Sequence, residues 1–256
     1  MRNTLNIKVL LTFLLVIVSV GCLNATGFEN ETLRYVISYK WGLIHKDAGD
    51  ATLSLRRHGD RYTVMLTAKT KPWADKFYSV RDTLKGSIKV NGLKPVSYTK
   101  ITHEKGKYAR DEITYGITGQ TTHGVARRFR EKDGETKMTE KNLSATGPVY
   151  DMLSVFYYLR KLDYAQLNKN KIYTATVFSG NKKETIKIRS LGIKKIKLKD
   201  KSVREAYQIK FNFTQEGGRK SSDDIDTWIS TDSSHIPLYI VGRLPVGEVR
   251  AYFLGK

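Results

Sequence analysis

Apolar and polar residues alternate along most of the chain. In residues 32–40, for example, Leu33, Tyr35, Ile37 and Tyr39 fall on one face, which is the pattern of a half-buried β-strand. Turn dipeptides such as Gly59-Asp60 and Asn91-Gly92 separate the alternating segments. The pattern predicts about a dozen strands joined by short links, at residues 32–40, 49–57, 62–68, 77–90, 94–103, 110–117, 124–131, 172–178, 184–199, 206–214, 225–230, 237–242 and 248–254.

One stretch, residues 147–160, has a helical pattern instead. Its apolar residues recur at three- and four-residue spacing: Met152, Val155, Phe156 and Leu159. Asp151 is the predicted N-cap, because its carboxylate can accept from the amides of the first turn. A single apolar helix must pack on a sheet, so we expect it to contribute to the core. The alternative is that its polar side chains reach into a cavity that the helix closes.

The strand pattern favours an all-β, mainly antiparallel fold over a parallel α/β fold. We expect a large curved sheet or a lipocalin-like or LolA-like β-barrel, with one amphipathic helix packed on it or in it. A flatter two-sheet sandwich is the competing architecture. Residues 26–256 are expected to form a single β-barrel-like domain, since no linker divides them. A barrel of this many strands has room for a ligand.

Residues 1–25 read as a signal peptide, with a basic start and an apolar run too short to span a membrane. The protein is therefore expected to be exported. Two processing routes compete: Ser19-Val-Gly-Cys22 resembles a lipobox, with cleavage after Gly21 and lipidation of Cys22, and ordinary cleavage could occur after Ala25 or Gly27. Cys22 is the single cysteine, so the mature protein has neither an internal disulfide nor a cysteine-based metal site.

The chain is strongly basic, with a formal net charge of +20. In an exported protein this charge points away from nucleic acid and toward lipid phosphates, acidic glycans or the membrane surface; a merely soluble basic surface is the alternative. Apolar and basic residues alternate within 186–189 and 193–199. We interpret that row as protection of a sheet edge in preference to an anion-binding stripe.

No catalytic signature is present. The five histidines lie far apart without metal-ligand spacing, and nothing reads as a nucleophile elbow or a phosphate-binding loop. The acidic cluster Asp223, Asp224 and Asp226 lacks the pattern of a calcium loop, so we interpret it as a solvated loop. No cofactor and no metal site is therefore predicted.

Residues 150–160 carry a Tyr-Asp-x-x-Ser-x-x-Tyr-x-x-Arg pattern that resembles the signature of a bacterial exported family, catalogued as domain of unknown function 3108. Residues 33–39, 48–53, 73–82, 228–232, 236–238 and 247–251 resemble other blocks of that family, in the same order. The resemblance spans nearly the whole mature chain. It implies an exported, mostly β envelope protein and assigns no activity.

Together these features favour a non-catalytic binding module for an amphipathic or anionic envelope molecule, either a lipid or a glycan. The candidate ligand-binding residues are Tyr150, Asp151, Tyr157, Tyr158, Arg160, Asp82, Trp73 and Asp232. One alternative is a hydrolase acting on envelope glycans, in which Asp82, Asp151 or Asp232 acts beside Tyr150 and Arg160. The other is a structural assembly factor at the membrane surface.

Overall fold

The structure is a computed structural model that describes residues 27–256 apart from 133, 217, 219–221 and 245. The predicted signal peptide and Cys22 lie outside the described residues, so both processing routes stay predictions. No helix in the described part of the chain is long and apolar enough to cross a membrane.

The described residues form fifteen strands of one sheet and four short helical segments. The strands are β1 (Glu31–Trp41), β2 (Ile44–His58), β3 (Arg61–Thr70), β4 (Val80–Lys89), β5 (Pro95–Glu104), β6 (Lys107–Thr118), β7 (Thr121–Lys132), β8 (Glu135–Thr146), β9 (Val149–Tyr150), β10 (Tyr173–Ser179), β11 (Lys182–Lys197), β12 (Val203–Gln215), β13 (Ile225–Ser230), β14 (Pro237–Arg243) and β15 (Glu248–Gly255). The helical segments are α2 (Pro72–Asp75), the 3-10 helix η1 (Asn91–Leu93), α3 (Ser154–Leu159) and α4 (Tyr164–Leu167).

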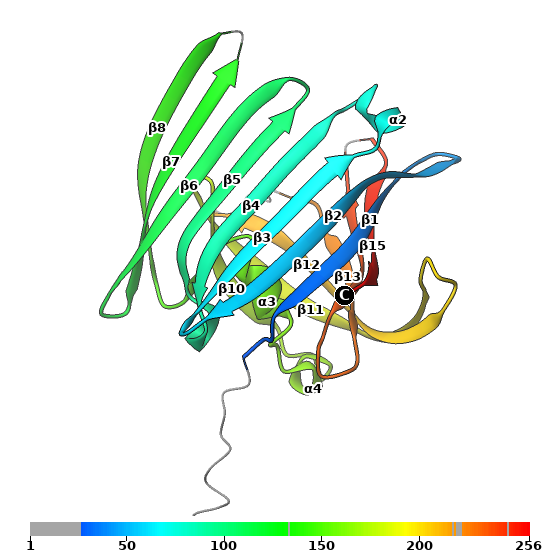
Figure 1. The fold of residues 1–256 in the computed structure, drawn as a ribbon. Coiled ribbons are helices and arrows are strands. Elements are labelled where there is room, and N and C mark those ends of the chain that lie inside the picture. Colours follow the sequence, from blue (N-terminus) through cyan, green and yellow to red (C-terminus); the bar gives the residue numbers. More distant parts are fainter. Residues whose placement is uncertain (1–26, 133, 217, 219–221, 245) are drawn as a thin grey trace, which may run out of the picture.

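Neighbouring strands follow the chain from β8 back to β1, and β1 then pairs with β15, which leads back through β14 to β9. All pairs are antiparallel except the short parallel pair of β9 and β10. The sheet rolls into a nearly closed barrel (Figure 1), which confirms the predicted all-β, mainly antiparallel fold.

Antiparallel order places alternate connections at opposite ends of the barrel. We call the end with the β1–β2, β3–β4, β10–β11 and β14–β15 connections the rim end. The other end, which we call the plug end, carries the β2–β3 and β13–β14 connections together with α3 and α4. Phe28, at the start of the described chain, also lies at the plug end, where its amide is bonded to the Tyr62 hydroxyl.

Side chains close the barrel where the hydrogen-bonded sheet ends. The ring of Phe178 on β10 lies so close to Gly124 on β7 that a Cβ there would be 2.8 Å from it, and Phe178 stacks on Tyr115 of β6. Glycine at position 124 therefore permits the close approach of the two walls. Arg128 of β7 adds a 3.0 Å hydrogen bond to the Asn181 side chain.

Each of the predicted strand ranges overlaps an observed strand, whereas β8 and β9 were not predicted. Most side chains of β8 are exposed on both faces, so no face had to be apolar and the period-two signal is absent. The predicted strand at 77–90 begins only at Val80, because the short helix α2 and its exit occupy the residues before it.

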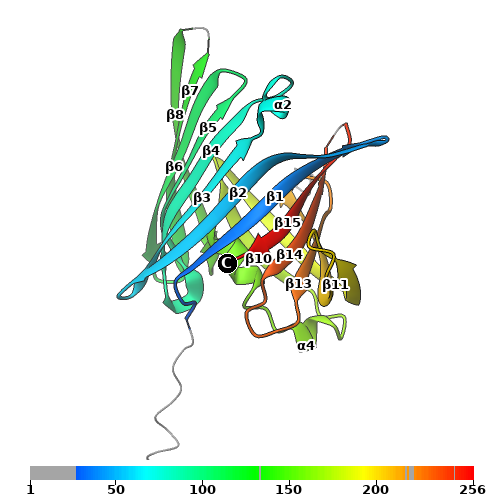
Figure 2. The ribbon, with the colours of Figure 1, turned by 45° about the vertical axis from the view of Figure 1, so that its right-hand side comes forward.

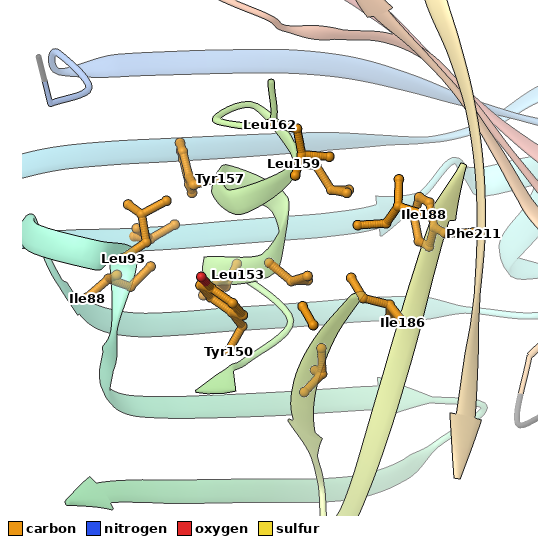
Figure 3. Close-up of a cluster of buried hydrophobic side chains, with 14 of the residues drawn as sticks. Ile88, Leu93, Tyr150, Leu153, Tyr157, Leu159, Leu162, Ile186, Ile188 and Phe211 are labelled. Carbon is orange, nitrogen blue, oxygen red and sulfur yellow. The ribbon is translucent and has the colours of Figure 1, made fainter. Parts of the chain in front are cut away.

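The prediction of one helix over residues 147–160 was wrong in length and number. β9 keeps Val149 and Tyr150 extended against β10, a turn follows, and α3 covers only Ser154–Leu159. Helix α3 lies in the middle of the main hydrophobic core (Figure 3), with Leu153, Tyr157 and Leu159 all buried. Its expected packing role is therefore confirmed.

The basic row of β11 is divided in two. Ile186 and Ile188 are fully buried between exposed Lys187 and Arg189, as predicted. Pairing with β10 ends at Ile188, so the remainder of β11 pairs only with β12 and has a free edge. Ile193 on that edge is half exposed, and the lysines around it stand where edge protection is needed.

Candidate ligand cavity

Asp151 starts the turn that leads into α3. Its Oδ1 accepts hydrogen bonds from the amides of Leu153 at 2.8 Å and Ser154 at 2.7 Å, while its own amide donates to the Ser154 hydroxyl at 2.7 Å. This reciprocal arrangement is a capping box. The predicted N-cap was wrong by two residues, because Leu153 is the N-cap of α3 and has no side-chain cap bond. Asp151 instead caps the turn that precedes the helix, and through it the Ser154 amide.

Arg160, at the other end of α3, is held in a buried ion pair. Its Nη1 donates to Oε1 of Glu31 on β1, and its Nη2 donates to Oε2 of the same carboxylate at 3.2 Å. Its Nε and Nη2 also donate to the Ser234 carbonyl at 3.1 and 3.0 Å, and its guanidinium lies over the rings of Phe28 and Tyr157. We call residues 149–167, which contain β9, α3 and α4, the plug. The contacts of Arg160 tie the plug to β1 and to the β13–β14 turn.

A cavity of about 430 Å³ is lined by residues of the sheet and of the segment before α3. Met152, just before α3, lies on its plug side, and Gly180 and Asn181 of the β10–β11 turn lie on its rim side. Its apolar lining consists of Leu66, Ala68, Leu84, Tyr98, Met152 and Phe213, and its charged lining of Lys100, Arg128, Lys182, Asp82, Asp111 and Glu184.

The strand register explains why these residues meet. Cross-strand pairing places Leu66, Leu84, Lys100, Asp111 and Arg128 opposite one another in one row across β3 to β7, and opposed residues share a face of the sheet. Along β3 the inward residues Tyr62 and Val64 are fully buried, whereas Leu66 and Ala68, nearer the rim, are only half-buried. The core therefore gives way to the cavity partway along the barrel.

Arg128 has a fixed position in the cavity wall. Its Nε donates to Asp111 over 3.0 Å and its Nη1 to Asn181 over 3.0 Å, and Arg130 pairs with the same Asp111 carboxylate at 2.6 Å. One carboxylate thus serves two guanidinium groups, which leaves this part of the wall cationic.

Several polar atoms near the cavity are buried without a hydrogen-bond partner among the described residues. They are Asp82 Oδ1 and the Tyr98 hydroxyl, which belong to lining residues, and the Tyr115 hydroxyl and Asp151 Oδ2. Each such atom costs about 1 to 3 kcal/mol if nothing bonds to it. A concave site with unsatisfied polar groups is the usual form of a binding site.

Burial also changes the acidity of these groups. Desolvation, followed by the charge of Glu104, raises the pKa of Asp82. Desolvation raises the pKa of Asp151 from 3.8 to about 6, although the amides of Ser154 and Leu153 act in the opposite direction. The pKa of Tyr98 is raised by burial and by the nearby charges of Asp151, Asp111 and Asp82. Burial therefore favours the neutral form of Asp82 in the cavity wall, and of Asp151 beside it, unless a cation or a donor faces them.

A second, smaller cavity of about 310 Å³ shares Asp82 and Ala68 with the first. Its other lining residues come from neighbouring strands β2 to β5: Asp50, Thr52, Thr67, Lys69, Arg81, Thr83 and His103. Asp82 is thus the acidic residue common to both cavities.

Of the eight predicted ligand-binding residues, Asp82 alone lines either of these cavities. Five, from Tyr150 to Arg160, lie in the plug, where Tyr150 stacks on Tyr158. Trp73 lies in α2 at the rim end and donates to the Asp47 carbonyl at 2.8 Å. Asp232 accepts from the Ser234 amide in the β13–β14 turn. The carboxylates considered for a hydrolase therefore do not share one site.

Sequence reasoning missed most of the cavity wall, in particular Tyr98, Lys100, Asp111 and Arg128. Each is the inward residue of a strand that was predicted correctly. The available signal is a polar residue at an inward position, where the alternation predicts an apolar one. This signal can be recognised only when the strand register is known.

Comparison with known proteins agrees with this architecture. The family model for a protein of unknown function, DUF3108, matches residues 34–254. The chain belongs to the DUF3108 family. The search of curated proteins gave no match. Among solved structures, the DUF3108 chain is similar to the crystal structure of a β-barrel-like protein of domain of unknown function DUF1849 from Brucella abortus, with a TM-score of 0.60 and 11% identity over 89% of this chain and 97% of the other.

The signature pattern of this DUF3108 chain belongs to the plug. Its five defined positions are all buried: Tyr150, Asp151, Ser154, Tyr157 and Arg160. Their contacts build the capping box, the ion pair with Glu31 and the aromatic packing around Phe28. The pattern therefore describes how the barrel is plugged.

Proposed function

We propose that this DUF3108 protein is an exported, non-catalytic binding module that holds one amphipathic envelope molecule with an anionic head group. The observation that carries the proposal is the 430 Å³ cavity, which combines an apolar surface with the fixed guanidinium of Arg128, the lysines Lys100 and Lys182, and unpartnered polar atoms. Its volume lies within the roughly 300–1,000 Å³ typical of small-molecule sites. The predicted signal peptide and the basic composition support an envelope location and an anionic partner.

The lining suggests how the ligand is oriented. Leu66, Leu84 and Phe213 offer apolar contact to an acyl or other hydrocarbon portion. Lys100 and Arg128 offer charge-assisted bonds to a phosphate or carboxylate. The unpartnered Asp82 Oδ1 and Tyr98 hydroxyl require donors or acceptors from the same head group. A lipid or an acidic glycan conjugate satisfies all three requirements.

Occupation of the cavity is tested by filling it. Leu66→Trp adds bulk on the inward face of β3, and the matched control Met65→Trp adds the same bulk on the exposed outer face. Exported protein is purified and its co-purifying small molecules are identified by mass spectrometry. We expect wild type and Met65→Trp to carry the same amphipathic molecule and Leu66→Trp to lose most of it. Equal loads in all three proteins, or none in wild type, would refute the proposal.

The anionic head group is tested with Lys100→Gln against the exposed control Lys85→Gln on the outer face of β4. Loss of one charge-assisted bond lowers affinity about tenfold or more, so we expect that reduction for Lys100→Gln alone, measured by titration of the identified molecule. Unchanged affinity would remove the anionic head group from the proposal and leave the cavity in place.

A further inference from the structure

The tip of the β1–β2 hairpin is apolar and exposed. Trp41 and Ile44 pair across the end of the hairpin, and Gly42 and Leu43 form the two-residue turn between them. Gly42 adopts a φ of 54°, which a glycine reaches without strain. Leu43 is fully exposed, with a relative accessibility of 106%, and Trp41 is 55% exposed. Turn positions normally carry polar residues, so the fold gives no reason for leucine here.

A second exposed apolar segment lies against this tip. Leu244 and Val246, in the β14–β15 turn, are both exposed. The Tyr39 hydroxyl donates to the Val246 carbonyl at 2.8 Å, and a Cβ on Gly247 would lie 3.2 Å from the Trp41 Cβ. Figure 2 shows the two turns next to each other beyond the barrel wall. We call Trp41, Leu43, Ile44, Leu244 and Val246 the rim patch.

Basic residues surround the rim patch. Lys40 and Arg243 flank its two turns, and Lys46 lies over the Trp73 ring at 4.6 Å. Lys199 and Arg250 pair with Asp47 and Glu248 respectively. The pKa of His45 is lowered, first by desolvation and then by the charges of Arg250, Lys199 and Lys40, against the opposite effect of Asp47. The surroundings of the tip are therefore cationic.

We propose that the rim patch docks this protein onto an anionic lipid surface, with Leu43 and Trp41 inserted between the head groups and the surrounding lysines and arginines on the lipid phosphates. A projecting tip inserts into an interface, whereas a protein partner of a convex tip needs a groove of its own. Tryptophan with flanking basic residues is the usual composition of an interfacial anchor. The inference goes beyond the proposed cavity ligand and does not depend on it.

The position of the rim patch links the two proposals. The patch lies at the rim end, as do Gly180 and Asn181 of the 430 Å³ cavity, and the plug closes the other end with buried side chains. When the rim patch docks the barrel on a membrane, the rim side of the cavity therefore faces the lipid. The lining residues on that side are the least buried ones.

The docking is tested by co-sedimentation of the exported protein with vesicles of phosphatidylcholine alone or mixed with phosphatidylglycerol. A Cys22→Ala background removes any acyl chain at that residue. The variant is Leu43→Glu, whose wild-type side chain is fully exposed, and the matched control is Ile172→Glu, a 53% exposed residue at the plug end. Circular dichroism confirms that both fold.

We expect binding to the mixed vesicles that weakens as salt rises. Leu43→Glu should reduce the partition coefficient about tenfold or more, because the inserted apolar side chain is lost, and Ile172→Glu should behave as wild type. Equal binding of Leu43→Glu and wild type, or no vesicle binding at all, would overturn the inference. A wild-type dimer that Leu43→Glu converts to a monomer, without vesicle binding, would identify the patch as a self-association surface and also overturn it.

The cavity variant Leu66→Trp separates this inference from the proposed function. If it loses its co-purified molecule and still binds vesicles, both proposals stand independently. If Leu43→Glu abolishes vesicle binding while wild type carries no ligand, the docking stands and the cavity proposal fails.

Discussion

The two ends of the barrel use the same kinds of residue, but they differ in how many of their polar groups have hydrogen-bond partners and in how much apolar surface is exposed. At the plug end, several charged and aromatic side chains are buried with partners: Arg160 bonds Glu31, and the Tyr164 hydroxyl donates to the Leu159 carbonyl at 2.9 Å. Asp151 Oδ2 and the Tyr157 hydroxyl are the exceptions there, since neither has a partner among the described residues.

Nearer the rim, Asp82 Oδ1 has no partner among the described residues and Leu43 is exposed to solvent. Tyr98, whose hydroxyl also has no partner, lies in the buried row of Val64 between the two ends. Buried polar groups with hydrogen-bond partners stabilise a fold. Buried polar groups without partners destabilise it unless another molecule bonds to them. The difference agrees with the proposals above, in which the plug has a structural role and the rim side a binding role.

The largest expected effect is at Arg160. Arg160→Ala strands the buried Glu31 carboxylate, so we expect a loss of about 3 to 5 kcal/mol in the free energy of unfolding. Arg127→Ala breaks an exposed ion pair with Glu140 and should cost about 1 kcal/mol or less. Urea unfolding measures both. Similar small losses for the two variants would remove the distinction between the ends.

Asp151 tests the plug through pH. Its folded pKa is raised from 3.8 to about 6, so the folded state holds this proton more tightly than the unfolded state. Its contribution to stability is therefore fully present below about pH 4, is lost as pH rises from about 4 to about 6, and stays lost by a constant amount above pH 6. Asp151→Asn, which stays neutral, should gain on the order of 2 to 3 kcal/mol relative to wild type between pH 4 and pH 8.

The same urea titrations at the two pH values include Asp151→Ala as a control. That variant leaves the amides of Leu153 and Ser154 without their acceptor and should lose about 1 to 2 kcal/mol where Asp151→Asn does not. A pH-independent difference between Asp151→Asn and wild type would mean that the carboxyl is solvated.

The smallest effect compares two buried tyrosines. Tyr164→Phe removes a hydroxyl that bonds Leu159 and should cost about 1 kcal/mol, whereas Tyr98→Phe removes a hydroxyl with no partner and should be neutral or stabilising by about 1 kcal/mol. Thermal unfolding measures the pair. If Tyr98→Phe destabilises as much as Tyr164→Phe, the Tyr98 hydroxyl already has a partner, and the contrast between partnered and unpartnered buried groups weakens.

The amino-acid sequence determined most of the strands, because a strand that buries one face alternates apolar and polar residues with a period of two. The strand around Leu33 and Tyr35, the turn at Gly59 and the capping carboxylate of Asp151 are all local features, so local patterns were enough to predict them. The family pattern around Asp151 and Arg160 was also visible. From the sequence alone the pattern could belong either to a packed plug or to a ligand site. Both arrangements place polar side chains on a buried helix, so the pattern does not distinguish them.

Tertiary structure alone decided which residues meet. Arg160 and Glu31 are 129 residues apart, and the row from Leu66 to Arg128 exists because five strands are in one particular register. β8 left no period-two signal because both of its faces are largely exposed. Register and closure arise from long-range pairing that no local window contains. The cavity and the rim patch are therefore properties of the rolled sheet.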